Sequence, residues 1–280
     1  MITAQTFALG VMGDQRVRHS LSPLMHNRVL AGRGLAGVYL AFAVEPAQVG
    51  PAIAGMRALG LAGLNVTVPH KQAVIPFLDA LAPEAARLGA VNTIVPQPDG
   101  RLKGHNTDLG GFLAALAEHH GDPRGQGAVV TGAGGAARAV VAALAGAGAS
   151  PLYLLARDPA KSQALARELG GEARPWGELA PLVAACPLLV NATAVSAPAE
   201  SPALAAQVEG LTLPAGGLVL DLNYGRPVNF WRQLAARSGA AFADGLAMLA
   251  QQARLSFTLW TGVEATAAEF RQPLEEAHAG

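Results

Sequence analysis

Short apolar runs alternate along the chain with longer amphipathic or Ala-rich segments, and this order predicts an α/β protein. Short uncharged runs are typical of buried strands, and longer Ala-rich or amphipathic segments between them are typical of helices. Strands are expected at residues 7–12, 38–44, 61–68, 128–131, 152–155, 187–190 and 217–221. Helices are expected at 23–32, 46–59, 84–88, 108–120 and 245–260, with a further helix from Glu264. Such alternation builds parallel sheets covered by helices.

Two stretches interrupt this alternation. Residues 91–95 and 101–103 are separated by Asp99-Gly100, which favours a tight turn, so we expect a hairpin there. The region from His119 to Gly127 is rich in Gly and Pro and marks a boundary between domains.

Composition narrows the class of protein. The 280 residues suffice for two domains, and 51% of them are hydrophobic. The 20 basic and 20 acidic residues balance, which argues against a nucleic-acid-binding protein. A single cysteine, Cys186, excludes an internal disulfide and suits a reducing compartment. With no signal-peptide pattern at residues 1–13 and with 139–156 broken by Gly, Ser and Pro, we expect a cytoplasmic protein without membrane contact.

A glycine-rich turn follows the apolar run at 128–130 and precedes an Ala-rich segment. It reads Gly132, Ala133, Gly134, Gly135, Ala136, then Ala137. The strand–turn–helix setting makes this Gly-x-Gly-x-x-Ala pattern a dinucleotide-binding signature. Glycines permit the tight turn and close approach of a pyrophosphate, and the helix N-terminus offers free N–H groups to it.

The end of the next expected strand favours NADP over NAD. NAD sites usually place an acidic side chain there to bind the ribose 2′-hydroxyl. This chain has Ala156-Arg157-Asp158, with Lys161 one turn later. Arg157 can pair with a 2′-phosphate, and Lys161 adds a second cation. Alternatively, Arg157 is a solvated loop charge and Asp158 caps a helix that begins at Pro159.

Four polar motifs stand in the first half, at ends of expected strands or starts of helices. They are His19-Ser20-Leu21-Ser22-Pro23, Asn65-Val66-Thr67-Val68-Pro69-His70-Lys71, Gly89-Ala90-Val91-Asn92-Thr93 and Gly104-His105-Asn106-Thr107-Asp108. Each alone has a structural explanation, such as a helix N-cap at Ser22 or Asp108. Together they supply the hydroxyl, amide, ammonium and carboxylate groups that bind a small hydroxylated substrate.

With further motifs in the second half, the chain resembles the shikimate dehydrogenase family from Gly13 to Gly262. These motifs are Asn191-Ala192-Thr193, Asp221-x-x-Tyr224, Met248-Leu249-x-x-Gln252-Ala253 and Phe257-x-x-Trp260-Thr261-Gly262. The resemblance implies reversible NADP-dependent oxidation of the C3 hydroxyl of shikimate to 3-dehydroshikimate, run as a reduction in aromatic amino-acid biosynthesis. It also implies a substrate-binding α/β domain at 1–108, an NADP-binding Rossmann domain at 109–244, and C-terminal helices at 245–280 that pack on the first domain.

The resemblance assigns roles to individual residues. Lys71 and Asp108 look like the catalytic pair, and which of them accepts the proton stays open. Substrate-binding groups are Ser20 and Ser22 for the carboxylate, Asn65, Thr67, Asn92 and Gln252 for ring hydroxyls, and Tyr224 near substrate and nicotinamide. Cofactor-binding residues are Gly132, Ala133, Gly134, Gly135, Ala136, Arg157, Lys161, Asn191, Thr193 and Gly245. No metal site is expected. A partly desolvated lysine beside a carboxylate suits the proton transfer that alcohol oxidation requires.

Several positions depart from the family pattern. Gly13-Asp14-Gln15 stands for Gly-x-Pro, Ala156 for Asn, Ser196 for Gly, Asn229 for Thr, and Gly225-Arg226-Pro227 makes one segment a residue longer. We expect Ala156 to cost one hydrogen bond, about 0.5–1.5 kcal/mol, and so to soften the NADP preference. We expect Ser196 to restrict a loop beside the nicotinamide.

Other functions fit less well. Relatives that favour quinate often have Thr at the second serine of Ser-x-Ser, so Ser22 favours shikimate. A methylene-tetrahydrofolate dehydrogenase needs an aromatic-lined pocket, and only 5% of residues are aromatic. A non-catalytic regulator that binds ligand and nucleotide does not need both Lys71 and Asp108. The sequence leaves monomer and homodimer open.

Overall fold

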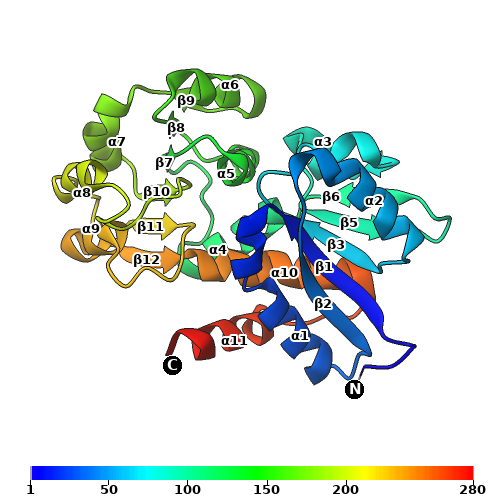
Figure 1. Ribbon diagram of the computed structural model, residues 1–280. Helices are drawn as coiled ribbons and strands as arrows, with labels where there is room; N and C mark the ends of the chain where they lie inside the picture. Colours follow the sequence, from blue (N-terminus) through cyan, green and yellow to red (C-terminus); the bar gives the residue numbers. More distant parts are fainter. Residues whose placement is uncertain (1, 280) are drawn as a thin grey trace. The chain divides into compact units, whose positions relative to one another are not determined.

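The computed structural model describes residues 2–279, which form two compact α/β units (Figure 1). One unit runs to Gly111 and resumes at Ala250, and the other is Phe112–Leu249. Each contains a six-stranded sheet. Two helices, α4 (Thr107–His119) and α10 (Gly245–Thr261), include the points at which the chain passes from one unit to the other.

The sheet of the first unit is mixed and has the strand order β2-β1-β3-β5-β6-β4. Its strands are β1 (Phe7–Gly13), β2 (Gly37–Ala43), β3 (Gly63–Val66), β4 (Ala80–Leu81), β5 (Thr93–Pro96) and β6 (Leu102–His105). β1 pairs in parallel with β2 and β3, whereas β5 runs antiparallel to β3 and β6. The hairpin prediction is confirmed, because β5 and β6 pair antiparallel and the turn at Gly100 is too short for the crossover that a parallel pair requires.

Helices cover this sheet and supply its core. They are α1 (Ser22–Gly32), α2 (Val49–Ala58), α3 (Pro83–Leu88) and α11 (Ala267–Ala279), joined by part of α4 and α10. Ile53 of α2 packs with Met12, Leu64 and Ile94 of the sheet. The helix expected at 46–59 begins instead with the 3-10 turn Pro46–Gln48.

The last helix starts at Ala267 rather than at the expected Glu264, and the reason is a capping box. The Thr266 hydroxyl accepts from the backbone N–H of Glu269, and the Glu269 carboxylate accepts from the backbone N–H of Thr266. Glu269 also pairs with Arg33 at the end of α1, with 2.7 Å between Nη2 and Oε2. These contacts dock α11 on α1, beside which it lies in Figure 1.

The second unit has a fully parallel sheet with strand order β12-β11-β10-β7-β8-β9. Its strands are β7 (Ala128–Thr131), β8 (Leu152–Leu155), β9 (Glu172–Ala173), β10 (Leu188–Asn191), β11 (Leu218–Asp221) and β12 (Ala241–Asp244). Its helices are α5 (Gly135–Ala147), α6 (Pro159–Leu169), α7 (Leu179–Ala185), α8 (Pro202–Glu209) and α9 (Phe230–Ser238), with the rest of α4 and α10.

This order is that of a dinucleotide-binding fold, numbered 3-2-1-4-5-6 from β9 to β12. Strand order reverses between β7 and β10, and ligands of such sheets bind at the carboxyl ends of the strands beside that point. Register aligns Thr131 of β7 with Asn191 of β10, and Asn191 with Asp221 of β11. The glycine turn and the Asn191 loop therefore leave the sheet next to each other.

Candidate functional site

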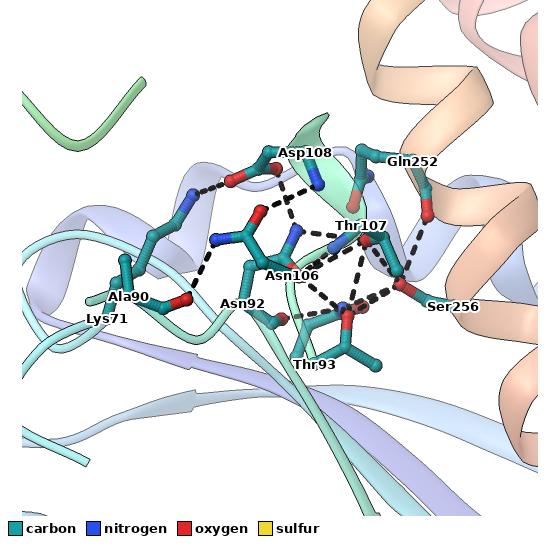
Figure 2. Close-up of polar contacts among 10 residues, drawn as sticks. Lys71, Ala90, Asn92, Thr93, Asn106, Thr107, Asp108, Gln252 and Ser256 are labelled. Atoms are coloured by element: carbon teal, nitrogen blue, oxygen red, sulfur yellow. Dashed lines mark hydrogen bonds and ion pairs between the residues drawn. The ribbon is translucent and has the colours of Figure 1, made fainter. Parts of the chain in front are cut away.

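Lys71 and Asp108 form an ion pair in the first unit. Their Nζ and Oδ2 atoms lie 2.6 Å apart, and the two side chains are only 16% and 10% exposed (Figure 2). Asp108 lies in the first turn of α4, where the helix dipole favours a carboxylate. Lys71 follows β3, and its backbone carbonyl accepts from Val91 N–H just before β5. The fold thus brings together two charged groups 37 residues apart in sequence.

Two asparagines fix the Asp108 carboxylate. Asn92 donates through Nδ2 to Asp108 Oδ1 at 2.7 Å, so each carboxylate oxygen has its own donor. Asn106 accepts from the backbone N–H of Asp108 and donates to the carbonyl of Ala90. The Asn-Thr-Asp motif therefore orients the carboxylate as well as supplying it.

Asn65 at the end of β3 belongs to the same polar cluster. Its Nδ2 donates to the backbone carbonyl of Asn92 at 3.0 Å, and its Oδ1 accepts from the Tyr39 hydroxyl at 2.6 Å. The Tyr39 hydroxyl also contacts Ser22, and burial raises the pKa of this phenol well above its usual value. Tyr39 hence stays protonated and donates to Asn65.

A buried histidine supports Tyr39. The rings of His26 and Tyr39 stack with centroids 4.2 Å apart, and Phe270 meets His26 edge-on. Burial lowers the pKa of His26 to about 3, so the imidazole stays neutral at physiological pH. Within residues 2–279 neither ring nitrogen has a hydrogen-bond partner, and the ring acts by packing.

The remaining expected substrate groups of this unit are Ser20, Ser22, Thr67 and Gln252. Ser22 starts α1 and its backbone N–H donates to the Ser20 hydroxyl at 3.2 Å. Thr67 follows β3, held by a bond from its N–H to the Met12 carbonyl. Gln252 lies on α10 where this helix packs closely against α4. A Cβ on Gly111 of α4 would lie 2.8 Å from the backbone nitrogen of Gln252. Glycine at 111 therefore allows α10 to bring Gln252 close to the start of α4, as Figure 2 shows.

Sequence reasoning missed three residues of the cluster besides Tyr39. Thr93, Thr107 and Ser256 bring their hydroxyls within 2.8–3.3 Å of one another. Thr93 and Thr107 lie inside the quoted motifs. The signal at Ser256 is a polar residue one helical turn after Gln252 on an otherwise apolar helix face.

In the second unit, the glycine turn connects β7 to α5 in the expected way. Gly132 has φ +110°, and a Cβ there would lie 2.6 Å from the Ala192 carbonyl oxygen, so the fold itself requires glycine. Gly134 is the N-cap of α5, and a Cβ on it would meet no atom of the described residues within 4 Å. Ala133 precedes Gly134 in the turn, and Gly135 and Ala136 are the first two residues of α5.

The expected 2′-phosphate residues lie beyond β8. Arg157 is exposed and makes no ion pair with any residue between 2 and 279, while Lys161 is exposed in the first turn of α6. Asp158 caps α6 by accepting from the backbone N–H of Ala160 at 3.1 Å. Capping of α6 explains why an aspartate stands at position 158. Arg157 and Lys161 are the exposed cations on either side of it.

Asn191 organises the loop after β10. It is fully buried, its Oδ1 accepts from Thr193 at 2.8 Å and from Thr131 at 3.0 Å, and its Nδ2 donates to Asp221. The loop residue Ser196, where the family usually has Gly, is also buried and accepts from Asn223 Nδ2 at 2.8 Å. Asn191 thus shapes the backbone around Thr193 rather than presenting its own side chain to solvent.

Tyr224 follows β11, and burial raises the pKa of its phenol, an effect that Arg226 opposes. Arg226 lies in the longer segment, donates to the Tyr224 carbonyl at 2.7 Å and pairs with Glu200 at 3.0 Å. Gly245 begins α10, where a Cβ would lie 2.1 Å from the Leu222 carbonyl oxygen.

No three or more His, Cys, Asp or Glu side chains of residues 2–277 gather in a way that could hold a metal ion. None of the helices in this range has the length and hydrophobicity that crossing a membrane demands.

Comparison with known proteins gives a consistent result along the chain. The shikimate dehydrogenase substrate binding domain matches residues 11–94, shikimate/quinate 5-dehydrogenase matches 115–229, and the shikimate 5′-dehydrogenase C-terminal domain matches 245–274. A shikimate dehydrogenase (NADP+) of Moorella thermoacetica is 45% identical over 99% of this chain and 95% of its own length.

Solved structures agree with the sequence relatives. Shikimate dehydrogenase from Aquifex aeolicus superposes with a TM-score of 0.89 at 34% identity, covering 98% of this chain and 99% of that one. The Thermus thermophilus shikimate 5-dehydrogenase in complex with NADP(H) and shikimate gives 0.84 at 39% identity, covering 97% and 99%. Both units of this chain therefore have counterparts in solved structures of one family.

Proposed function

The chain belongs to the shikimate dehydrogenase family and carries out NADP-dependent oxidation of shikimate to 3-dehydroshikimate, and we propose that Lys71 and Asp108 move the proton in this reaction. The observation that supports this role is the 2.6 Å contact between an ammonium and a carboxylate that are both largely shielded from water. The reaction is reversible, and biosynthesis uses it as a reduction.

Alcohol oxidation removes a hydride from carbon and a proton from oxygen. NADP, when bound, accepts the hydride. Lys71 contacts the C3 hydroxyl and stabilises the developing alkoxide by charge. The hydroxyl proton passes to the Lys71–Asp108 pair: the ammonium gives one of its protons to the Asp108 carboxylate as it takes the proton of the hydroxyl, so that the pair gains one proton in all. Asp108 holds the ammonium in place through the direct contact of Oδ2 with Nζ. Asn92 keeps the carboxylate from rotating away.

The substrate is held by groups of complementary type. Ser20 and Ser22 donate to the carboxylate of shikimate, while Asn65, Thr67, Asn92 and Gln252 bind its ring hydroxyls. Tyr224 is the further substrate-binding residue that we propose, through its phenol. The contact of Ser22 with Tyr39, and of Tyr39 with Asn65, supports a single connected set of substrate groups.

The cofactor is held by the second unit. Residues 132–136 and the N-terminus of α5 bind the pyrophosphate, Arg157 and Lys161 bind the 2′-phosphate, and Thr193 with its support Asn191 lies beside the nicotinamide ribose. Gly245 keeps the start of α10 close to the loop after β11. The position of the glycine turn between β7 and α5, beside the point where strand order reverses, supports this assignment, as do the exposed side chains of Arg157 and Lys161.

The enzyme is cytoplasmic and acts as a monomer or a homodimer. Burial raises the pKa of the Cys186 thiol, which makes this one cysteine unreactive. Light scattering coupled to size-exclusion chromatography distinguishes the two assemblies.

The function is tested by initial rates with NADP and with NAD, each with shikimate and with quinate, followed at the nicotinamide absorbance. Fast turnover with shikimate and NADP is expected. Lys71→Ala should lower kcat by about 10²–10⁴-fold with the KM for shikimate within threefold of wild type. Wild-type turnover in that variant refutes the role of Lys71, and turnover with quinate widens the substrate range.

A further inference from the structure

Ser256 lies in the polar cluster without any role assigned to it. It is fully buried on α10, one turn after Gln252. Its Oγ lies 2.8 Å from Thr93 Oγ1, 3.0 Å from Thr107 Oγ1, 3.1 Å from Asn65 Nδ2 and 3.1 Å from the Gln252 carbonyl (Figure 2). A serine in the middle of a helix can satisfy its hydroxyl by donating to the carbonyl four residues earlier. If Ser256 had only that role, the contact with the Gln252 carbonyl would be enough.

The contacts of Asn65 determine which end of its amide faces which way. Nδ2 points to three oxygens, those of the Asn92 carbonyl, Thr93 and Ser256. The Asn92 carbonyl can only accept, so the nitrogen and not the oxygen of the amide must face it. Oδ1 points the other way and accepts from the protonated Tyr39 hydroxyl.

This arrangement leaves one free hydrogen-bonding position on Asn65. Nδ2 has two hydrogens, and both are directed at oxygens of the protein. Oδ1 has two lone pairs, of which the Tyr39 hydroxyl uses one. Asn65 can therefore meet a further group only as an acceptor, and that group must be a donor.

We propose that Ser256 is a positioning residue that, together with the Asn92 carbonyl and Thr93, holds the nitrogen of the Asn65 amide inward, so that Asn65 accepts a hydrogen bond from a hydroxyl of the substrate. The inference rests on the proposed role of Asn65 in binding shikimate. It gives α10 a second contribution to the recognition of ring hydroxyls, beside that of Gln252. A site built in this way selects a hydroxyl against a group that only accepts.

The test compares three substrates in two enzymes. The substrates are shikimate and two analogues in which one of the ring hydroxyls other than that at C3 is replaced by fluorine, which accepts weakly and cannot donate. In the wild type, one analogue should lose about 100-fold in kcat/KM, because Asn65 Oδ1 then faces an acceptor. Ser256→Ala should lower kcat/KM for shikimate about tenfold, mainly through KM, with the KM for NADP unchanged.

The decisive result is the pattern among substrates. Ser256→Ala should lower kcat/KM by less than threefold for the analogue that wild type disfavours, because the contact is already lost, and about tenfold for the other analogue. Thr258→Val is the matched control, since the Thr258 hydroxyl bonds the carbonyl four residues earlier on the same helix but touches none of the cluster. It should leave all three substrates within twofold of wild type.

An equal loss for all three substrates in Ser256→Ala, or no loss for shikimate, overturns the proposal. The first result would mean that Ser256 only stabilises α10. Calorimetric binding of the three compounds to wild type and Ser256→Ala repeats the comparison without turnover. The ratios of the dissociation constants then judge this inference, while the wild-type rate with shikimate judges the proposed function separately.

Discussion

Replacing Asp108 by asparagine should abolish most turnover while preserving the fold, because every orientation of the new amide opposes its surroundings. Asp108 receives Lys71 Nζ on one oxygen and Asn92 Nδ2 on the other, at 2.6 and 2.7 Å. An asparagine amide has one oxygen and one nitrogen. If the oxygen faces Lys71, the nitrogen faces the Asn92 donor, and in the reverse orientation it faces the ammonium. Either way one donor meets another, and Lys71 loses its negative partner.

The expected size follows from the role of the pair. Positioned acid–base catalysis contributes about 10²–10⁴-fold, so Asp108→Asn should lower kcat by that factor. This corresponds to about 3–5 kcal/mol of transition-state stabilisation. Initial rates of NADPH formation with saturating shikimate measure the effect, and the KM for NADP should stay within twofold. Asp158→Asn is a matched control, since this aspartate also stands at a helix start, where asparagine caps equally well. A kcat within threefold of wild type in Asp108→Asn would refute the reasoning.

Three further predictions concern the cofactor and stability. Arg157→Ala should raise the KM for NADP about tenfold or more by removing a charge-assisted contact with the 2′-phosphate, with the KM for NAD within twofold; an equal rise with both cofactors argues against that contact. Gly132→Ala should cost at least about 1–3 kcal/mol in urea unfolding, because φ is +110° and the new Cβ would meet the Ala192 carbonyl, whereas an unchanged midpoint contradicts the turn geometry. The bond from Arg33 holds the pKa of Glu269 at about 2, below its ordinary 4.5. The lowered pKa stabilises the fold above about pH 4.5 and is lost as pH falls through 2, so wild type should exceed Glu269→Gln in Tm at pH 6 but not near pH 2.

The sequence predicted the secondary structure best where an apolar run or a pair of turn residues indicates an element by itself. Strands at 128–131 and 152–155 match their expected limits, and Asp99-Gly100 correctly predicted a hairpin. β9 has two residues, too few to show a spacing of its own, and the four residues of β12 include the charged Asp244 and only one large apolar side chain, Phe242. Their existence depends on pairing with β8 and β11, which is a property of the assembled sheet.

The polar cluster shows a similar limit. The motif around Lys71 and the motif that ends in Asp108 can be recognised one at a time, because each is contiguous in sequence. Ser256 reaches Asn65 across 191 residues, and Tyr39 reaches it from an apolar strand. Such partners are set by the packing of α10 and by the pairing of β1 with β2 on one side and with β3 on the other, and no local pattern encodes that arrangement.

The departures from the family pattern in the second unit are connected rather than independent. Ser196 brings a hydroxyl into a fully buried position, which costs free energy unless it is bonded, and Asn223 supplies that bond. Asn229 caps α9 and also donates to Asp221 at 2.7 Å, the same buried carboxylate that receives Asn191 and Asn223.

The longer segment, Gly225-Arg226-Pro227, also connects the loop after β10 with the loop after β11, on their more exposed side. Arg226 holds Glu200, whose carboxylate accepts the backbone N–H groups of Ser196 and Ala197 at 2.7 and 3.0 Å. The loop after β10 and the loop after β11 are therefore tied at two points, one buried and uncharged at Ser196 and one half-exposed and ionic at Glu200. Because a glycine at 196 could supply neither the hydroxyl nor the same restriction of the backbone, the serine and the added arginine act together to fix the relative positions of Thr193 and Tyr224.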